Sequence, residues 1–296
     1  MKNLSAILRR HAGQRTVLGV AIPVLTGLIQ ALRQETEFAG LTEPEIESGF
    51  RQLCGQFIKS DFHSTYIVRR LSPRSFLEFH EGPYRFRGEL LQGATLPELE
   101  QLHVDLIASL RDAYEQRKAA MNRLEAACRL PEENIAERRQ LVEEYLSQFM
   151  GNRGENFEIV SFAVLREYFR SFGFHLQRFS TTHANDGGID YVGGEAIYQV
   201  TVDESAQKFT ADMAKAPGAK RVLVRPKILP AIRDSCDESV LETIELSDLL
   251  AHFVGWLLDR DHRANRARHL QGILRVALDE FRREEKAEAD VSLLDD

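Results

Sequence analysis

The feature that most constrains the fold of this chain is a run near its middle that contains two glycine pairs and an aspartate between apolar segments. The run reads Asn185-Asp186-Gly187-Gly188-Ile189-Asp190-Tyr191-Val192-Gly193-Gly194-Glu195-Ala196-Ile197-Tyr198-Gln199-Val200-Thr201-Val202. Stretches rich in β-branched and aromatic residues on either side of a Gly-Gly turn are typical of a β-hairpin. The sequence therefore predicts two antiparallel strands, with Asp190 at the end of the first and Gln199 inside the second.

Alternation along the second strand decides which side chains share a face of the sheet. Successive side chains of a strand point to opposite faces. We therefore expect Gln199, Thr201 and Asp203 on one face. Val200 and Val202 lie on the other.

A set of hard oxygen ligands is predicted around this hairpin. Upstream, a helix begins near Gly154 and carries Glu158. Mg²⁺ takes oxygen ligands, usually one or two carboxylates completed by water and phosphate. We expect a site for Mg²⁺, with Mn²⁺ as a substitute, at Asp190, the Gln199 side chain and the Val200 carbonyl. Glu158 is expected near enough to act through water.

In order and spacing these elements resemble the catalytic domain of Mrr-type restriction endonucleases, a branch of the PD-(D/E)xK nucleases. The matching pieces are Phe157-Glu158 near the start of the helix, the unbroken Asp186-Gly187-Gly188-Ile189-Asp190, and Gln199-Val200-Thr201, where the family has Gln-x-Lys. The resemblance covers residues 151–259. It implies a Mg²⁺-dependent endonuclease that cuts double-stranded DNA in defence against foreign DNA.

The rest of this segment alternates strands with helices. Strands are predicted over 174–179, 221–225 and 240–246, and helices over 206–215, 229–236 and 248–258. Such alternation indicates an α/β layer with a partly parallel sheet. The predicted fold is thus a restriction-endonuclease-like mixed sheet flanked by helices.

Thr201 departs from the family pattern, because it occupies the place of the catalytic lysine. In that family the lysine positions or polarises the attacking water and offsets charge in the transition state, so the resemblance implies catalytic roles for Glu158, Asp190, Gln199 and position 201. Losing one preorganised electrostatic group costs about 10²–10³ in rate at other sites. Lys208 is the first choice for a displaced cation, and Lys215 on the same predicted helix is the second.

Alternatives stay open for these residues and for the function. Asp186 is also explained by an Asx-turn, Glu158 by the preference for acids in the first turn of a helix, and Lys208 by a solvated helix face. The alternative to an endonuclease is a catalytically inactive nuclease fold that binds DNA or a partner protein within a defence complex. Whether the chain is an enzyme is therefore uncertain from the sequence.

Residues 1–93 are expected to form a winged-helix-like domain. Two amphipathic helices are predicted, over 23–38 and from Thr42 onward, and a two-stranded ribbon turns at Gly82-Pro83. The functional interpretation is DNA binding, and the alternative is a protein–protein module. The residues expected to contact DNA phosphates are Arg69, Arg70, Arg85 and Arg87.

The remaining segments are predicted to be helical. Residues 94–150 contain two long helices, over 96–127 and 131–150, that form a linker or a dimerisation arm. Leu99, Leu102, Leu106 and Leu110 begin its apolar stripe. Since nucleases that cut both strands commonly use two active sites, we expect a homodimer. Residues 260–296 are expected to form a C-terminal helix and tail.

Composition sets the outer limits. The chain has 296 residues, enough for two or three domains, and 43% of them are hydrophobic. A net charge of -7 disfavours a general nucleic-acid coat but permits a local basic stripe. Three widely spaced cysteines form neither a metal pattern nor a disulfide framework. The sequence contains no apolar stretch of bilayer length and no signal-peptide pattern at its start, so we expect a cytoplasmic protein.

Overall fold

The computed structural model describes residues 2–10, 15–55, 76–79, 83–148, 154–179, 189–214 and 216–290. The chain forms two compact units, one of residues 1–120 with 286–296 and the other of residues 121–285. The helix α5 (Leu96–Cys128) contributes to both units, and the boundaries predicted after residues 93, 150 and 259 stay predictions.

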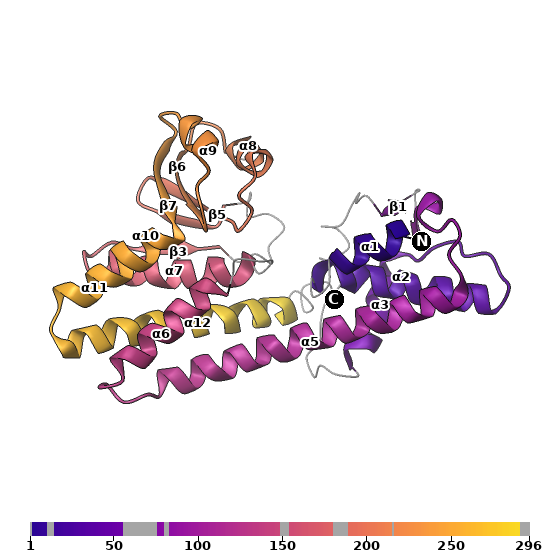
Figure 1. Ribbon diagram of the computed structural model, residues 1–296, viewed down its shortest axis with the longest axis horizontal. Coiled ribbons are helices and arrows are strands. Elements are labelled where there is room, and N and C mark those ends of the chain that lie inside the picture. The colour runs from indigo at the N-terminus through magenta and orange to yellow at the C-terminus, as the bar shows by residue number, and fades with distance from the viewer. Residues whose placement is uncertain are drawn as a thin grey trace. The chain divides into compact units, whose positions relative to one another are not determined.

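The first unit combines helices with a small ribbon. Its helices are α1 (Lys2–Arg10), α2 (Arg15–Arg33), α3 (Glu43–Gly55), the 3₁₀ helix η1 (Gly88–Leu90) and the first part of α5 (Figure 1). Strands β1 (Leu77–Phe79) and β2 (Tyr84–Phe86) pair antiparallel, as the sequence predicted. The turn at Gly82 lies outside the described residues, and the winged-helix arrangement stays a prediction.

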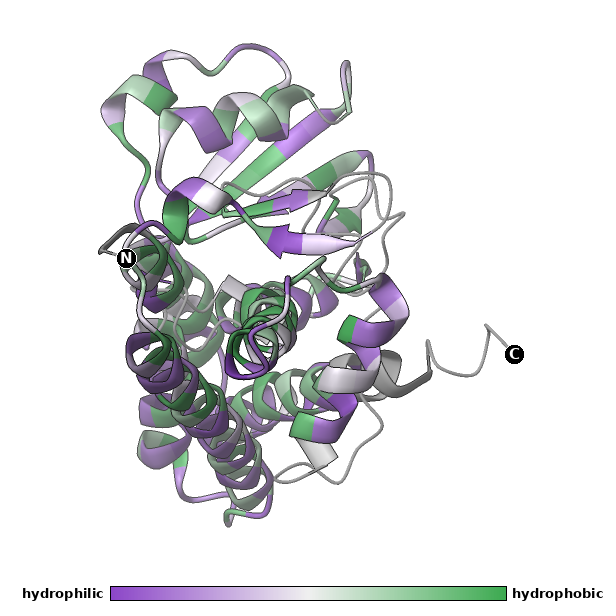
Figure 2. Cartoon of the chain, turned by 90° about the vertical axis from the view of Figure 1, so that its right-hand side faces the viewer, coloured by the Kyte–Doolittle hydropathy of each residue, from purple (hydrophilic) through white to green (hydrophobic). Residues whose placement is uncertain are grey.

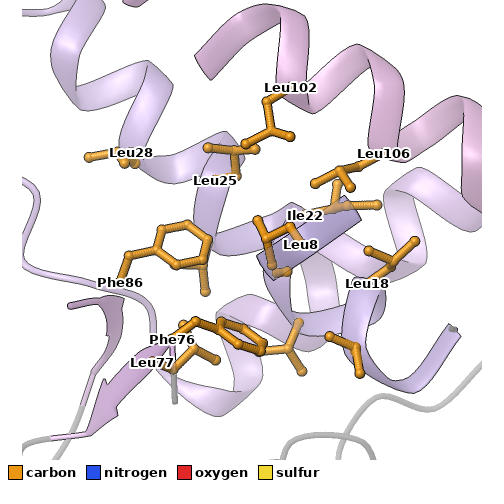
Figure 3. Close-up of a cluster of buried hydrophobic side chains, with 14 of the residues drawn as sticks. Leu8, Leu18, Ile22, Leu25, Leu28, Phe76, Leu77, Phe86, Leu102 and Leu106 are labelled. Atoms are coloured by element: carbon orange, nitrogen blue, oxygen red, sulfur yellow. The ribbon is translucent and has the colours of Figure 1, made fainter. Parts of the chain in front are cut away.

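The core of the first unit extends onto α5. Leu102 and Leu106 lie beside Ile22 and Leu25 of α2 (Figure 3). The four leucines of the predicted stripe are at most 2% exposed: Leu99, Leu102, Leu106 and Leu110. This stripe is therefore buried within the chain's own first unit and offers no apolar face to a second copy. The first unit is complete only with this part of α5.

The second unit is built around a mixed sheet. Its helices are the end of α5, α6 (Ile135–Ser147), α7 (Gly154–Arg170), α8 (Ala206–Ala214), α9 (Pro230–Asp234), α10 (Leu246–Asp248), the π-helix η2 (Leu249–Val254), α11 (Gly255–Arg260) and most of α12 (Arg263–Asp290). Its strands are β3 (Leu176–Arg178), β4 (Tyr191–Gly193), β5 (Ala196–Val200), β6 (Lys220–Arg225) and β7 (Val240–Glu245). The α/β class and the mixed sheet are as predicted.

The strands lie in chain order, β3-β4-β5-β6-β7. β3, β4 and β5 pair antiparallel, with Tyr191 opposite Tyr198 in the predicted hairpin. β5, β6 and β7 pair parallel, so α8 forms the crossover between β5 and β6.

Different helices cover the two faces of this sheet (Figure 1). On one face the rings of Tyr191 and Tyr198 meet α7, with centroids 5.1 Å from Phe162 and 6.4 Å from Phe169, respectively. On the other face Leu223 of β6 packs with residues of α8 and α9. Along the long helices, hydrophobic residues and hydrophilic residues gather on different sides (Figure 2). None of the helices within the described ranges has both the length and the apolar character that crossing a bilayer requires.

Candidate functional site

Asp190 is held between β3 and β5 by its side chain and its backbone. Its carboxylate Oδ2 accepts a hydrogen bond from the Val200 N–H at 2.6 Å. Its own N–H donates to the Tyr198 carbonyl at 3.3 Å, and its carbonyl accepts from the Phe179 N–H at 2.9 Å. Asp190 stands directly before β4, so the prediction that it ends the first hairpin strand is wrong. The hairpin pairing begins at Tyr191, one residue later.

Asp190, Gln199 and the Val200 carbonyl all lie at the C-terminal end of β5. Continuing the register of the hairpin places Asp190 opposite Gln199, and opposed residues of an antiparallel pair share a face. Gln199 is buried and pairs with Leu223, so it lies on the face covered by α8. The N–H and C=O groups of one strand residue point toward the same neighbouring strand. The Val200 carbonyl therefore points toward Asp190, as the Val200 N–H does.

These donors suit a hard divalent cation. A carboxylate, an amide oxygen and a backbone carbonyl are ligands that Mg²⁺ or Mn²⁺ accepts, with water and phosphate completing the shell. Within the described ranges, His, Cys, Asp and Glu side chains form no group of three or more that could hold a metal. Asp190 is thus the carboxylate of this set, and Gln199 and Val200 supply neutral oxygens. The Asp186-Gly187-Gly188 part of the motif lies outside the described residues.

Glu158 has a different partner from the one expected. Its carboxylate Oε1 accepts a hydrogen bond from Arg178 Nε at 2.9 Å, and Arg178 Nη1 reaches Glu280 Oε2 at 3.1 Å. The Glu158 carbonyl also accepts a hydrogen bond from the Tyr191 hydroxyl. Burial raises the pKa of Tyr191 well above its usual value, and the nearby Glu158 charge adds to this.

These contacts place Glu158 on the α7 side of the sheet. Arg178 pairs with Tyr191, so both lie on that face, whereas Gln199 lies on the α8 face. The Glu158 carboxylate serves a buried ion pair here, and its action on a metal through water stays a prediction.

Thr201 follows β5 and lies beside β6. Its N–H donates to the Val224 carbonyl at 3.2 Å, and its Oγ1 accepts a hydrogen bond from the Asp203 N–H at 3.1 Å. Val200 pairs with Val224 in parallel register, so the next residues, Thr201 and Arg225, are neighbours. Position 201, where the resemblance implies a lysine, therefore adjoins a buried arginine.

Arg225 is fully buried, and the sequence around it gives no sign that it belongs to this site, nor does that around its partner Asp212. Its Nη1 donates to the Asp203 carbonyl at 2.9 Å, and its Nη2 lies 3.5 Å from Asp212 Oδ2. Burial lowers the pKa of Arg225, and the charge of Asp212 opposes this shift. Its sequence signal is weak: an arginine at the end of a buried strand, with no local sign of its acidic partner.

Lys208 occupies the first turn of α8, as predicted. Its Nζ lies 2.6 Å from Asp212 Oδ1, and its N–H donates to Ser205 Oγ at 3.2 Å. Hydrogen bonds from Ser205 lower the pKa of Asp203, and the charges of Arg225 and Lys208 lower it further. Lys208 and Arg225 thus both pair with Asp212, and their charges both act on Asp203.

The arginines predicted to bind DNA are placed in part. Arg85 Nε donates to Glu78 Oε1 at 2.5 Å, and Arg87 Nη1 lies 3.9 Å from Glu89 Oε1. Both side chains are more than 40% exposed, so solvent and solutes reach them. Arg69 and Arg70 lie outside the described residues, as does Lys215.

Comparison of the chain with protein-family models, curated proteins and solved structures finds no match.

Proposed function

We propose that this chain is a divalent-cation-dependent endonuclease of double-stranded DNA, with a restriction-endonuclease-like fold and a role in defence against foreign DNA. One observation carries the proposal: the Asp190 carboxylate is hydrogen-bonded to the N–H of Val200. This bond brings a carboxylate, the Gln199 amide and a strand-end carbonyl to one end of β5. The alternation of strands and helices after β5 supports the proposal, since that order resembles the end of the Mrr catalytic domain.

The chain's own residues prepare the site for a cation. The Val200 N–H fixes one carboxylate oxygen of Asp190, and burial restricts the rotamers of Gln199. Asp190, Gln199 and the Val200 carbonyl would hold the ion. When bound, Mg²⁺ or Mn²⁺ supplies a Lewis acid for a phosphoryl oxygen and lowers the pKa of a coordinated water. Cutting both strands would use two such sites, so the proposal includes a homodimer, which sedimentation of the full chain tests.

Plasmid digestion tests the proposal. Wild type should cut methylated or unmethylated plasmid with Mg²⁺ or Mn²⁺ and not in EDTA. Asp190→Asn should reduce the rate of plasmid cleavage by at least about 10²–10³-fold, because the loss of one preorganised electrostatic group costs that much in other enzyme active sites. Asp234→Asn, an exposed acid on α9, is the matched control and should cut normally. Equal cleavage by Asp190→Asn and wild type would remove the proposed site.

A second candidate function is a nuclease fold that binds DNA or a partner protein without cleavage. Two contacts favour it: Thr201 Oγ1 accepts a hydrogen bond from the Asp203 backbone, and the Lys208 ammonium is held by Asp212. Position 201 then carries no positive charge for the transition state. Duplex binding by wild type, with intact plasmid in both metals, would select this candidate.

A further inference from the structure

We infer that Asp212 holds Lys208 as a withdrawn cation, which a DNA phosphate draws toward the site while Arg225 keeps Asp212 neutralised. The inference rests on the proposed function, because it assigns a phosphodiester of the nucleic acid as the second partner of Lys208.

Asp212 is a buried carboxylate shared by two cations. Its side chain is 2% exposed, with Lys208 Nζ at 2.6 Å from Oδ1 and Arg225 Nη2 at 3.5 Å from Oδ2. A buried charge without a partner is strongly destabilising. One cation is enough to compensate the buried charge of Asp212, and Asp212 pairs with two.

The two cations differ in their freedom to leave. The Lys208 side chain is 31% exposed, at the solvent-facing start of α8. The Arg225 side chain is 1% exposed, projects from a central strand and also donates to the Asp203 carbonyl. Lys208 can therefore move away while Arg225 remains as the counter-ion of Asp212. If Arg225 left Asp212 instead, its buried guanidinium would have to pass through the packed side chains around the sheet.

Lys208 is within electrostatic reach of Asp203, the residue bonded to Thr201, where the resemblance implies a lysine. The charges of Lys208 and Arg225 both act on Asp203, whose N–H is bonded to Thr201. The Asp203 Oδ1 already accepts a hydrogen bond from the Ser205 N–H. An ammonium on a flexible stem pairs with phosphate as readily as with carboxylate. A phosphodiester near Thr201 is thus the ligand that competes with Asp212 for Lys208.

Salt-dependent binding of a short DNA duplex to the full chain in EDTA tests the inference without cleavage. Each phosphate contact contributes about 0.9 to the slope of log K against log[salt]. Lys208→Gln should reduce the slope by about that amount, and Lys208→Arg should restore it. The matched control is Lys220→Gln, since Lys220 is exposed at the other end of the sheet and donates to the Glu238 carbonyl. Its slope should equal that of wild type.

Asp212→Asn provides the second arm. It should release Lys208 and tighten DNA binding several-fold, and the gain should vanish in Lys208→Gln/Asp212→Asn. If Asp212→Asn does not fold, the Lys208→Gln and Lys208→Arg slopes decide alone, since both variants keep the Asp212–Arg225 pair. An unchanged slope in Lys208→Gln overturns the inference even if wild type cleaves plasmid. A reduced slope with no cleavage supports the inference while the endonuclease proposal fails, and a wild type that does not bind DNA overturns both.

Discussion

Arg178 and Glu158 form an ion pair in the interior of the second unit, with 2.8 Å between Nη2 and Oε1. Glu280 of α12 binds the same guanidinium at 3.1 Å. One buried cation thus ties together α7, β3 and α12. Removing it leaves two buried carboxylates facing each other without the positive charge between them.

We therefore predict that Arg178→Met lowers the free energy of unfolding by about 3–5 kcal/mol, the usual effect of breaking a buried ion pair. Urea unfolding followed by circular dichroism measures it. The control is Arg139→Met, which removes an exposed pair with Glu143 on α6. Exposed pairs contribute about 0–1 kcal/mol, so the two losses should differ clearly. Similar losses would show that Arg178 does not hold these elements together.

Thr201→Lys places at this position the lysine that the Mrr resemblance implies. If wild type cleaves DNA, we expect an increase of up to about 10²-fold in rate, because one electrostatic contact in the transition state is worth that much. Plasmid digestion with Mg²⁺ measures it, and Thr210→Lys on the exposed face of α8 is the control for added charge. Cleavage by Thr201→Lys alone would identify a disarmed nuclease. Loss of activity in Thr201→Lys would contradict the assignment of this position.

Stability should fall at alkaline pH through buried tyrosines. Burial raises the pKa of Tyr145 and of Tyr198 to about 12 from the usual 10. Between pH 10 and 12 the unfolded chain therefore binds fewer protons than the folded chain. The protonated tyrosines' contribution to the free energy of unfolding is fully present below pH 10 and is lost as the pH rises to 12. Each pKa unit corresponds to about 1.4 kcal/mol. Urea unfolding of wild type and Tyr145→Phe from pH 9 to 11.5 checks this, and Tyr145→Phe should lose stability less steeply. Parallel curves would contradict the prediction.

The DNA-binding interpretation of the first unit depends on Arg85 and Arg87. In the full chain, Arg85→Gln/Arg87→Gln should reduce the salt slope of duplex binding by up to about 1.8, one phosphate contact for each residue. The full chain is used because the leucines of α5 complete this unit's core. Arg33→Gln, which removes a similarly exposed pair with Glu100, should leave the slope unchanged. A normal slope in the double variant would favour a protein-docking role for the ribbon.

Elements whose signals are local could be predicted from the residues alone. Alternation around Gly193-Gly194 specified the β4–β5 hairpin, and the same period placed Gln199 and Thr201 on one face. The start of α7 at Gly154 and the mixed sheet also followed from periodicity and turn residues. These features are set by neighbours along the chain, so a local pattern is enough to predict them.

Which charged side chains pair with one another depends on packing between distant segments. Glu158 finds Arg178 20 residues away and, through it, Glu280 another 102 residues along. Arg225 comes to Thr201 because a crossover helix sets β6 parallel to β5. The leucine stripe of α5 similarly packs against residues of α2, far away along the chain (Figure 3). The type of a residue indicates whether its partner is apolar or oppositely charged. Which residue becomes that partner depends on how distant segments pack.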